Sequence, residues 1–209
     1  MPTLKLGSTP VLTEALGALT INVANPTVTL GSNADITGCT FPAGHVLQTV
    51  SSTFTGTASG TGATSTLPHA DCSVSITPSH ASNKILITVH STLQTNGNAF
   101  ANFSFFKDST LITSAEGSDG NSNSLSATAS TGYSSSTDDS THRNAYLYPV
   151  SAQYLDTAGG TSAITYDFRV RARDSGGTWY LNRTADSNQN QDHIVNPIST
   201  ITVQEIMRT

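Results

Sequence analysis

Apolar and polar residues alternate along several stretches of the chain, which is the pattern of a β-strand with one buried face. The clearest stretch is 164–173. Every second residue there is apolar, and the residues between them are Thr165, Asp167, Arg169, Arg171 and Arg173. An unbroken alternation of this length predicts a strand in an antiparallel sheet that faces the core on one side only.

The same reasoning predicts a series of further strands. They are expected at 45–50, 74–76, 84–93, 99–107, 111–113, 145–155, 178–182 and 201–207. Asp108-Ser109 is the expected turn before 111–113, and Asp174–Gly177 is expected to close a hairpin between 164–173 and 178–182. No window of helical period lies between them, so a parallel sheet with crossover helices is excluded. The pattern predicts an all-β antiparallel sandwich or jelly roll.

The first 43 residues differ from the rest. They contain one aromatic residue, Phe41, and two carboxylates, Glu14 and Asp35. They predict short extended pieces at 19–23 and 27–30, which cannot enclose a core alone unless copies from several chains wind together. Residues 12–19 are expected to form one or two helical turns, weakened by Gly17. We therefore expect a short extended arm at 1–43 before a head domain at 44–209.

Composition narrows the classes of function. The charged fraction is 11% and the net charge is −5, whereas a nucleic-acid-binding protein usually carries a basic field. The hydrophobic fraction of 36% is too high for a disordered chain. Thr, Val, Ile and aromatic residues favour a pleated, half-buried surface, and the chain contains 33 Thr besides 28 Ser. We expect an all-β protein that has no nucleic-acid partner.

Targeting signals add a further expectation. The N-terminus lacks an apolar core of signal-peptide length, and no window approaches the ~20 apolar residues of a membrane span. Production in a cytoplasm without membrane insertion is expected.

The chain has two cysteines, Cys39 and Cys72. A disulfide between them is possible, but disulfides are rare in a cytoplasm, so two small buried residues are the favoured interpretation.

The strands carry a resemblance to a known family. It rests on the stretches 41–48 (FPAGHVLQ), 74–79, 82–89, 108–112, 148–150 with 154–156, 163–170, 180–183 and 199–206 (STITVQEI). Their order resembles a C-terminal domain that recurs in virion fibre and structural proteins of tailed bacteriophages, especially marine ones. The resemblance covers residues 41–207 and implies a trimeric jelly roll of the tumour-necrosis-factor type.

In such a homotrimer, residues 21–43 would form a thin shaft and residues 1–20 would attach to other virion proteins. The implied location is the virion, assembled in the host cytoplasm. This chain has a shorter segment before the domain than a long tail fibre has, which also opens a location on the capsid.

Candidate catalytic and metal sites are weak. His69, Asp71 and Cys72 form a PHADC cluster, which we interpret as a solvated loop, and no G-x-S-x-G elbow is present. The adjacent Asp138 and Asp139 point oppositely on an extended chain, so they suit a glycan-hydrolysing pair poorly. The 186–192 stretch has the oxygen spacing of a calcium loop without its glycine and glutamate, so a polar hairpin is favoured. We predict no catalytic residues, metal or cofactor.

Binding residues are more plausible. In the Ser-rich 117–143 stretch, Tyr with Ser and Asn offers adaptable contacts, although a solvated loop is the simpler interpretation. The receptor-binding candidates are Tyr133, Asp138, Asp139, His142, Arg143 and Trp179.

Three of these interpretations have plainer alternatives. Trp179 is more often a core or trimer-interface residue, and His45 is a candidate for the trimer axis, as an interface histidine rather than a metal ligand. The arginines at 169, 171 and 173 favour an ion-pair ladder with Asp167, Asp156, Glu205 or a neighbouring chain over polyanion binding.

The expected function is that of a non-enzymatic phage structural protein, a short trimeric fibre or spike that attaches to a host-surface glycan or protein. Two alternatives stay open. One is a capsid decoration, cement or head-fibre protein without receptor binding, and the other is a glycan-degrading enzyme of a tail spike.

Overall fold

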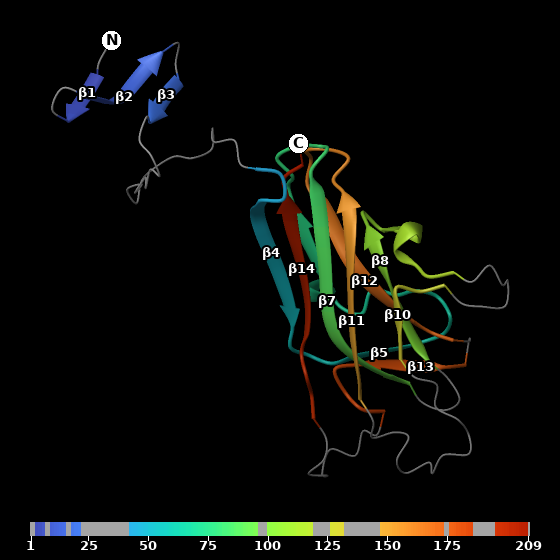
Figure 1. The fold of residues 1–209 in the computed structure, drawn as a ribbon. Helices are drawn as coiled ribbons and strands as arrows, with labels where there is room; N and C mark the ends of the chain where they lie inside the picture. Colours follow the sequence, from blue (N-terminus) through green and yellow to red (C-terminus); the bar gives the residue numbers. More distant parts are fainter. Residues whose placement is uncertain are drawn as a thin grey trace. The chain divides into compact units, whose positions relative to one another are not determined.

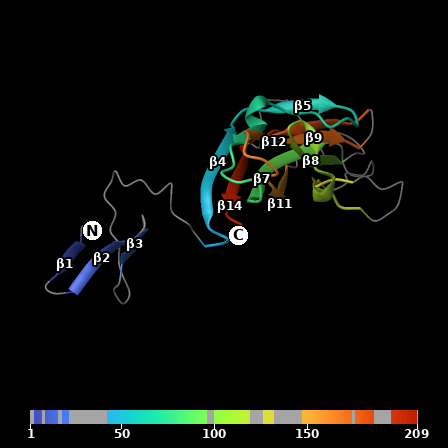
Figure 2. The same ribbon diagram turned by 90° about the horizontal axis from the view of Figure 1, so that it is seen from above.

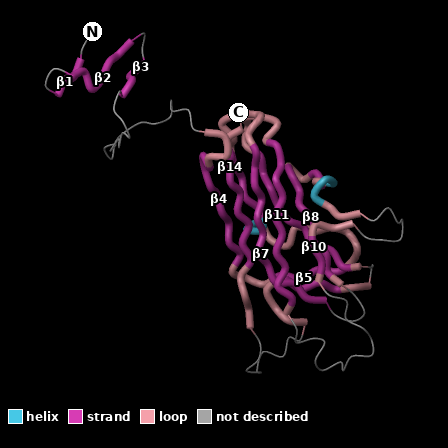
Figure 3. Tube along the Cα trace, in the orientation of Figure 1, coloured by secondary structure: helices cyan, strands magenta, loops and turns pink. Residues whose placement is uncertain are grey.

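The computed structural model describes residues 42–95, 100–118, 126–131, 147–173, 176–185 and 195–208, and the backbone of three strands before residue 22. The chain divides into two compact units, 1–40 and 41–209. The described regular structure is almost entirely strand, with two single-turn 3-10 helices, η1 (Ala70–Cys72) and η2 (Thr113–Ala115), as Figure 3 shows. The prediction of an all-β protein is confirmed.

The first unit contains a three-stranded antiparallel sheet. Its strands are β1 (Thr3–Leu6), β2 (Thr9–Ala15) and β3 (Ala18–Ile21), in that order. The helical turns predicted at 12–19 are wrong, because the backbone of β2 pairs with β1 on one side and with β3 on the other. These extended pieces pair within one chain. The predicted piece at 27–30 lies outside the described residues.

The first sheet of the larger unit is built around the long strand β7. Its members are β4 (Val46–Phe54), β14 (Ser199–Ile206), β7 (Lys84–Thr95), β11 (Tyr148–Thr157), β13 (Thr178–Leu181) and β5 (Ala58–Thr61). β14 and β11 flank β7 antiparallel, β4 pairs with β14, and β13 with β5 continues from the end of β7. Figure 1 shows β4, β14, β7 and β11 side by side.

The second sheet has the order β10-β8-β12-β6. Its strands are β10 (Ala129–Ser130), β8 (Ala101–Lys107), β12 (Ile164–Ala172) and β6 (Ser73–Ile76), and β9 (Thr110–Leu111) forms a hairpin with β8. Seen from above in Figure 2, β12, β8 and β9 form a layer distinct from β4, β14 and β7.

One hydrophobic core lies between the two sheets. β7 contributes Ile85, Ile87 and Val89, which are fully buried, and the second sheet contributes aromatic rings. The ring centroid of Phe103 lies 5.8 Å from the centroids of both Phe105 and Phe168. Burial of each such side chain stabilises the fold by roughly 1.5–3 kcal/mol. Because the core is enclosed between two sheets, the unit has a β-sandwich-like fold.

The strand at 164–173 is confirmed, but its predicted hairpin is wrong. The apolar set of β12 is buried as the alternation requires. However, β12 pairs with β8 and β6, whereas β13 pairs with β7 and β5 in the other sheet. Trp179 and Leu181 are buried in the shared core. The alternation in the sequence predicts that they are buried, but it does not show to which of the two sheets their strand belongs.

The turn between β8 and β9 is confirmed. Asp108 and Ser109 both have positive φ, at 47° and 66°. Two left-handed residues in a two-residue hairpin loop define a turn whose twist matches that of the flanking strands. Asp108 tolerates this conformation better than Ser109 does, because aspartate bonds locally to the backbone.

We expect Ser109→Gly to raise the free energy of unfolding by about 1 kcal/mol, because glycine removes the Cβ strain of a left-handed residue. Urea denaturation of the two proteins measures the difference. Ser162→Gly, at an exposed residue with no positive φ, is the control and should be neutral or destabilising. A loss of stability in Ser109→Gly would contradict the assigned turn.

The ends of the sandwich are distinguished by the strand registers. At one end, here called the base, Gly44 N–H donates to the Met207 carbonyl at 2.8 Å, and Ile206 pairs with Lys84. At the opposite end, here called the far end, Leu93 of β7 pairs with Tyr148 of β11. The intervening length of β7 is about 30 Å.

A buried carboxylate holds the base together. Glu205 is fully buried and accepts four hydrogen bonds, from Gln48 Nε2 (2.6 Å), Ser79 N (2.7 Å), Ser79 Oγ (2.8 Å) and Asn83 Nδ2 (2.6 Å). Burial raises the pKa of this carboxyl, but the hydrogen bonds outweigh it and the net shift is downward. The ionised side chain thus joins β14 to β4 and to the β6–β7 loop.

Candidate functional site

Most of the receptor candidates lie outside the described residues. These are Tyr133, Asp138, Asp139, His142 and Arg143. The described residues on either side of them are at the far end, because Thr131 N–H donates to the Ala101 carbonyl and Tyr148 pairs with Leu93. The predicted calcium-like stretch at 186–192 also lies outside the described residues.

Trp179 is a core residue in this structure. Its side chain is 2% exposed and pairs across the strands with Gly60. A Cβ at position 60 would lie 2.5 Å from Trp179 Cζ2, so only glycine leaves room for the indole ring. Of the two roles weighed for Trp179, packing therefore applies here, and its ring has no surface on which a ligand could stack.

His45 lies at the base, just before β4. The residue is exposed, and its backbone N–H and carbonyl bond to Pro42 and Met207. The proposed meeting of three His45 rings at a trimer axis stays a prediction. Across the described parts of the chain, no group of three His, Cys, Asp or Glu side chains could hold a metal ion.

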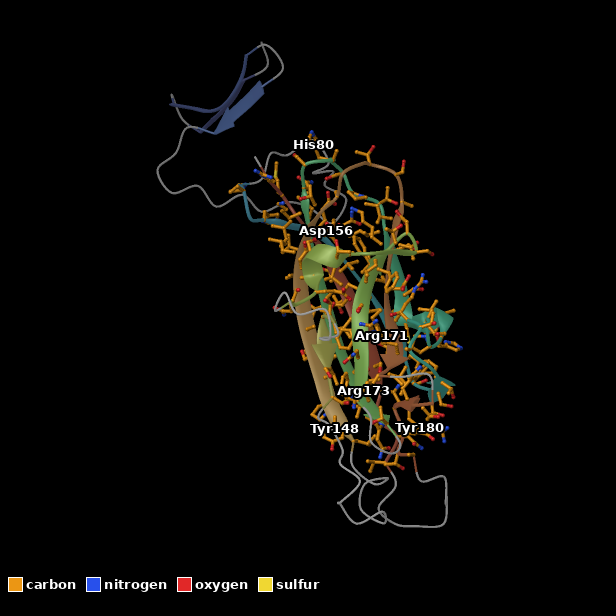
Figure 4. The ribbon with its side chains drawn as sticks, turned by 90° about the vertical axis from the view of Figure 1, so that its right-hand side faces the viewer. His80, Tyr148, Asp156, Arg171, Arg173 and Tyr180 are labelled. Carbon is orange, nitrogen blue, oxygen red and sulfur yellow. The ribbon has the colours of Figure 1, made fainter. Side chains whose placement is uncertain are left out.

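The arginines of β12 have separate partners. Arg169 Nε donates to Asp167 Oδ1 at 2.8 Å, and the guanidinium carbon lies 4.3 Å from the Phe106 ring centroid. Arg171 donates to the Ser126 carbonyl. Arg173 lies just beyond the end of β12, with its guanidinium carbon 5.9 Å from the Phe100 ring centroid, and Figure 4 labels it next to Arg171. The predicted ion pair with Asp167 is confirmed.

The two other carboxylates suggested as partners for these arginines bond elsewhere. Asp156 pairs with Lys107, and Glu205 accepts only from neutral groups among the described residues.

The PHADC cluster is not arranged for nucleophilic catalysis. Cys72 is 1% exposed and is a free thiol. Burial raises the pKa of this thiol to about 12, so it stays protonated at neutral pH. His69 stacks on Phe54 with ring centroids 4.5 Å apart, and its Nδ1 lies 3.3 Å from Asp71 Oδ2. The buried Cys72 agrees with the interpretation as a small buried residue, and Cys39 lies outside the described residues.

A second candidate surface is the outer face of β4, β14, β7 and β11. The strand registers place twelve residues on its central part in three rows of four, and a further row toward the base, Val46–Ile206–Lys84–Thr157, carries Lys84, whose Nζ donates to Thr157 Oγ1 at 2.6 Å. The central rows are Thr49–Gln204–Leu86–Leu155, Ser51–Thr202–Thr88–Gln153 and Thr53–Thr200–His90–Ser151. We call this central part the Thr-rich face. Figure 1 looks onto it, with β12 behind.

None of the twelve residues is acidic, lysine or arginine, and all are exposed or half-buried. Charged residues commonly make up about 25–35% of a solvated surface. Leu155, at one corner of the Thr-rich face, is 49% exposed. Because charged residues are depleted at the centre of protein interfaces, this uncharged central area, bordered by Lys84, is suited to being covered by another protein surface.

The polar groups of the Thr-rich face bond to one another. Ser51 and Thr202 hydroxyls lie 2.9 Å apart, Thr53 and Thr200 hydroxyls 3.3 Å apart, and Ser151 Oγ lies 3.1 Å from His90 Nδ1. Burying a polar group is costly mainly when its hydrogen bond is lost. Because these groups keep cross-strand partners, covering the face costs less than its polar composition suggests.

The chain matches no protein-family model and no curated protein. No helix in the described part of the chain has the length and apolar character to cross a membrane. The assignment of function therefore depends on the surfaces above and on the resemblance of the strands.

Proposed function

We propose that this chain is a non-enzymatic structural protein of a bacteriophage particle. In this proposal it forms a short homotrimeric fibre or spike, and the spike attaches the particle to the host surface. The observation that carries the proposal is the Thr-rich face, because an uncharged and internally hydrogen-bonded surface can pack against a neighbouring copy of the chain without burying a charge.

The strand order supports the jelly-roll part of the proposal. One sheet contains the order β4-β14-β7-β11 and the other has the order β10-β8-β12-β6. If the eight strands are lettered A to H along the chain, the sheets read A-H-C-F and E-D-G-B. Two Greek keys wound together give this order, and β5, β9 and β13 are additions to it.

The division of the chain supports an arm and a head. Residues 1–40 and 41–209 are separate compact units. In the proposal, residues 1–20 attach the spike to other virion proteins. The far end carries the described flanks of the 132–146 segment, and there a partner could be met without disturbing the sheets.

Competition for host cells tests attachment. Cells preincubated with the purified full-length protein are expected to adsorb fewer virions, because three copies per spike raise the effective concentration at the surface. A protein that only decorates the capsid would leave adsorption unchanged, and this result would overturn the attachment role. The Tyr133→Ala, Arg143→Ala double variant is the second arm. It should compete less well while keeping its oligomeric state.

A further inference from the structure

A shallow, open cleft lies between the β8–β9 hairpin, η2 and Asp156 of β11. Its volume is about 390 Å³, which falls in the range of small-molecule sites of about 300–1,000 Å³. The polar residues lining it are Lys107, Asp108, Thr110, Thr113, Ser114 and Asp156. In Figure 4 Asp156 lies beside the short helix η2, which carries two of these residues.

Asp156 is held rigidly at one wall of this cleft. Lys107 Nζ donates to Asp156 Oδ2 at 2.8 Å and to the carbonyls of Thr157 (2.8 Å) and Ala158 (3.0 Å), which uses its three hydrogens. The Tyr166 hydroxyl donates to the same Oδ2 at 2.8 Å. No described residue donates to Asp156 Oδ1, so this oxygen is left as an acceptor.

Asp108 supplies a second fixed carboxylate. Its left-handed backbone sets the hairpin turn, and Asp108 Oδ1 accepts from Thr165 N–H at 2.9 Å. Its Oδ2 receives no hydrogen bond from the described chain. Nearby, Ser114 Oγ lies 2.6 Å from the Tyr154 hydroxyl, and Thr113 is exposed. Acceptors and hydroxyl groups therefore line the same cleft.

The charges of the cleft select the class of ligand. Lys107 offsets Asp156, whereas Asp108 has no cationic partner among the described residues. The remaining negative charge disfavours an anion, and the Lys107 ammonium already occupies the group of three oxygens that would attract a cation. Sugar hydroxyls both donate to carboxylates and accept from hydroxyls, and Leu111 offers an apolar wall for carbon-bound hydrogens.

We propose that this cleft binds one neutral saccharide unit, with Asp108 and Asp156 accepting from its hydroxyls and Ser114 completing the contact. The inference rests on the attachment function proposed above, because a host-surface glycan would present such units. It places a sugar contact on the side of the head near the base, in addition to any contact at the far end.

Saturation-transfer NMR of the full-length protein with glucose, galactose, mannose and N-acetylglucosamine tests the proposal. Asp108→Asn keeps the Oδ1 acceptor and tolerates the left-handed backbone, and it should weaken saccharide binding about tenfold. Thr113→Trp should fill the cleft and abolish binding. Thr161→Trp is the matched control, because Thr161 is exposed and does not line the cleft.

Loss of the saccharide signal in Thr113→Trp, with retention in Thr161→Trp, would support the proposal. A signal that survives Thr113→Trp, or the absence of a signal from all four sugars, would overturn it. The adsorption assay separates this failure from that of the proposed function. Protein that competes with virions but binds no sugar would leave attachment standing without this cleft, and protein that does neither would remove both.

Discussion

Replacing Glu205 by alanine is expected to lower the free energy of unfolding by about 3 kcal/mol, since a hydrogen bond to a charged group contributes about 1.5–3 kcal/mol. The substitution removes the acceptor of four donors from Gln48, Ser79 and Asn83, of which the amide of Asn83 is fully buried. Urea denaturation with a constant slope measures the loss.

Glu116→Ala is the matched control. Glu116 is half-buried and accepts from a single described hydroxyl, that of Ser104, so its replacement should cost about 1 kcal/mol. The loss of stability in Glu205→Gln should lie between these two values, since glutamine keeps the shape of the side chain but places an amide N–H₂ group among donors. Equal losses in Glu205→Ala and Glu116→Ala would show that the base does not depend on the carboxylate.

The same carboxylate predicts a pH dependence. Because the pKa of Glu205 is lower in the folded protein than its ordinary value of 4.5, its stabilisation is fully present above pH 4.5. It is lost as the pH falls through the lower, folded-state value. Unfolding curves recorded at neutral and acid pH should show this loss in the wild-type protein. Glu205→Gln should lack that component.

In the proposed homotrimer, Thr88→Lys is expected to convert the assembly to monomers. Thr88 lies in the middle row of the Thr-rich face, between Thr202 of β14 and Gln153 of β11. A lysine there would place an unpaired charge in each covered interface, at a cost of several kcal/mol. That cost corresponds to a loss of affinity of at least a hundredfold. Sedimentation velocity measures the change in mass.

Ser75→Lys serves as the control for this substitution. Ser75 is an exposed residue of β6, in the other sheet, so the same added charge lies away from the Thr-rich face. It should leave the oligomer intact. If the two variants keep the same oligomeric state, the Thr-rich face is not the interface.

The sequence predicts individual strands well, because the alternation of apolar and polar residues that marks a strand spans only a few neighbouring residues. The alternation of β12 and the Asp108-Ser109 turn follow from backbone geometry within a few residues. Partner strands depend on contacts between distant residues, so the alternation of 178–182 could not show that β13 pairs with β7 rather than β12. The sequence does not predict the two-residue strand β10, because two residues within a Ser-rich stretch give no periodic pattern.

The buried and exposed sites likewise divide into those that a local pattern indicates and those that depend on contacts between distant residues. Glu205 follows Ile201 and Val203 in the buried phase of β14, so the alternation contains the information that it is buried, although its donors come from other elements. The Thr-rich face emerges only when four strands separated in the sequence are placed in register. The cleft at Asp156 likewise combines β8, η2 and β11, and no sequence motif marks it.

The mass of the intact protein in solution tests the central proposal most directly. Multi-angle light scattering of the full-length chain at micromolar concentration should give three times the chain mass of 21.8 kDa, with Thr88→Lys at the mass of one chain. A folded wild-type protein that stays monomeric under these conditions would contradict the account, because the Thr-rich face would then be a solvated surface rather than an interface.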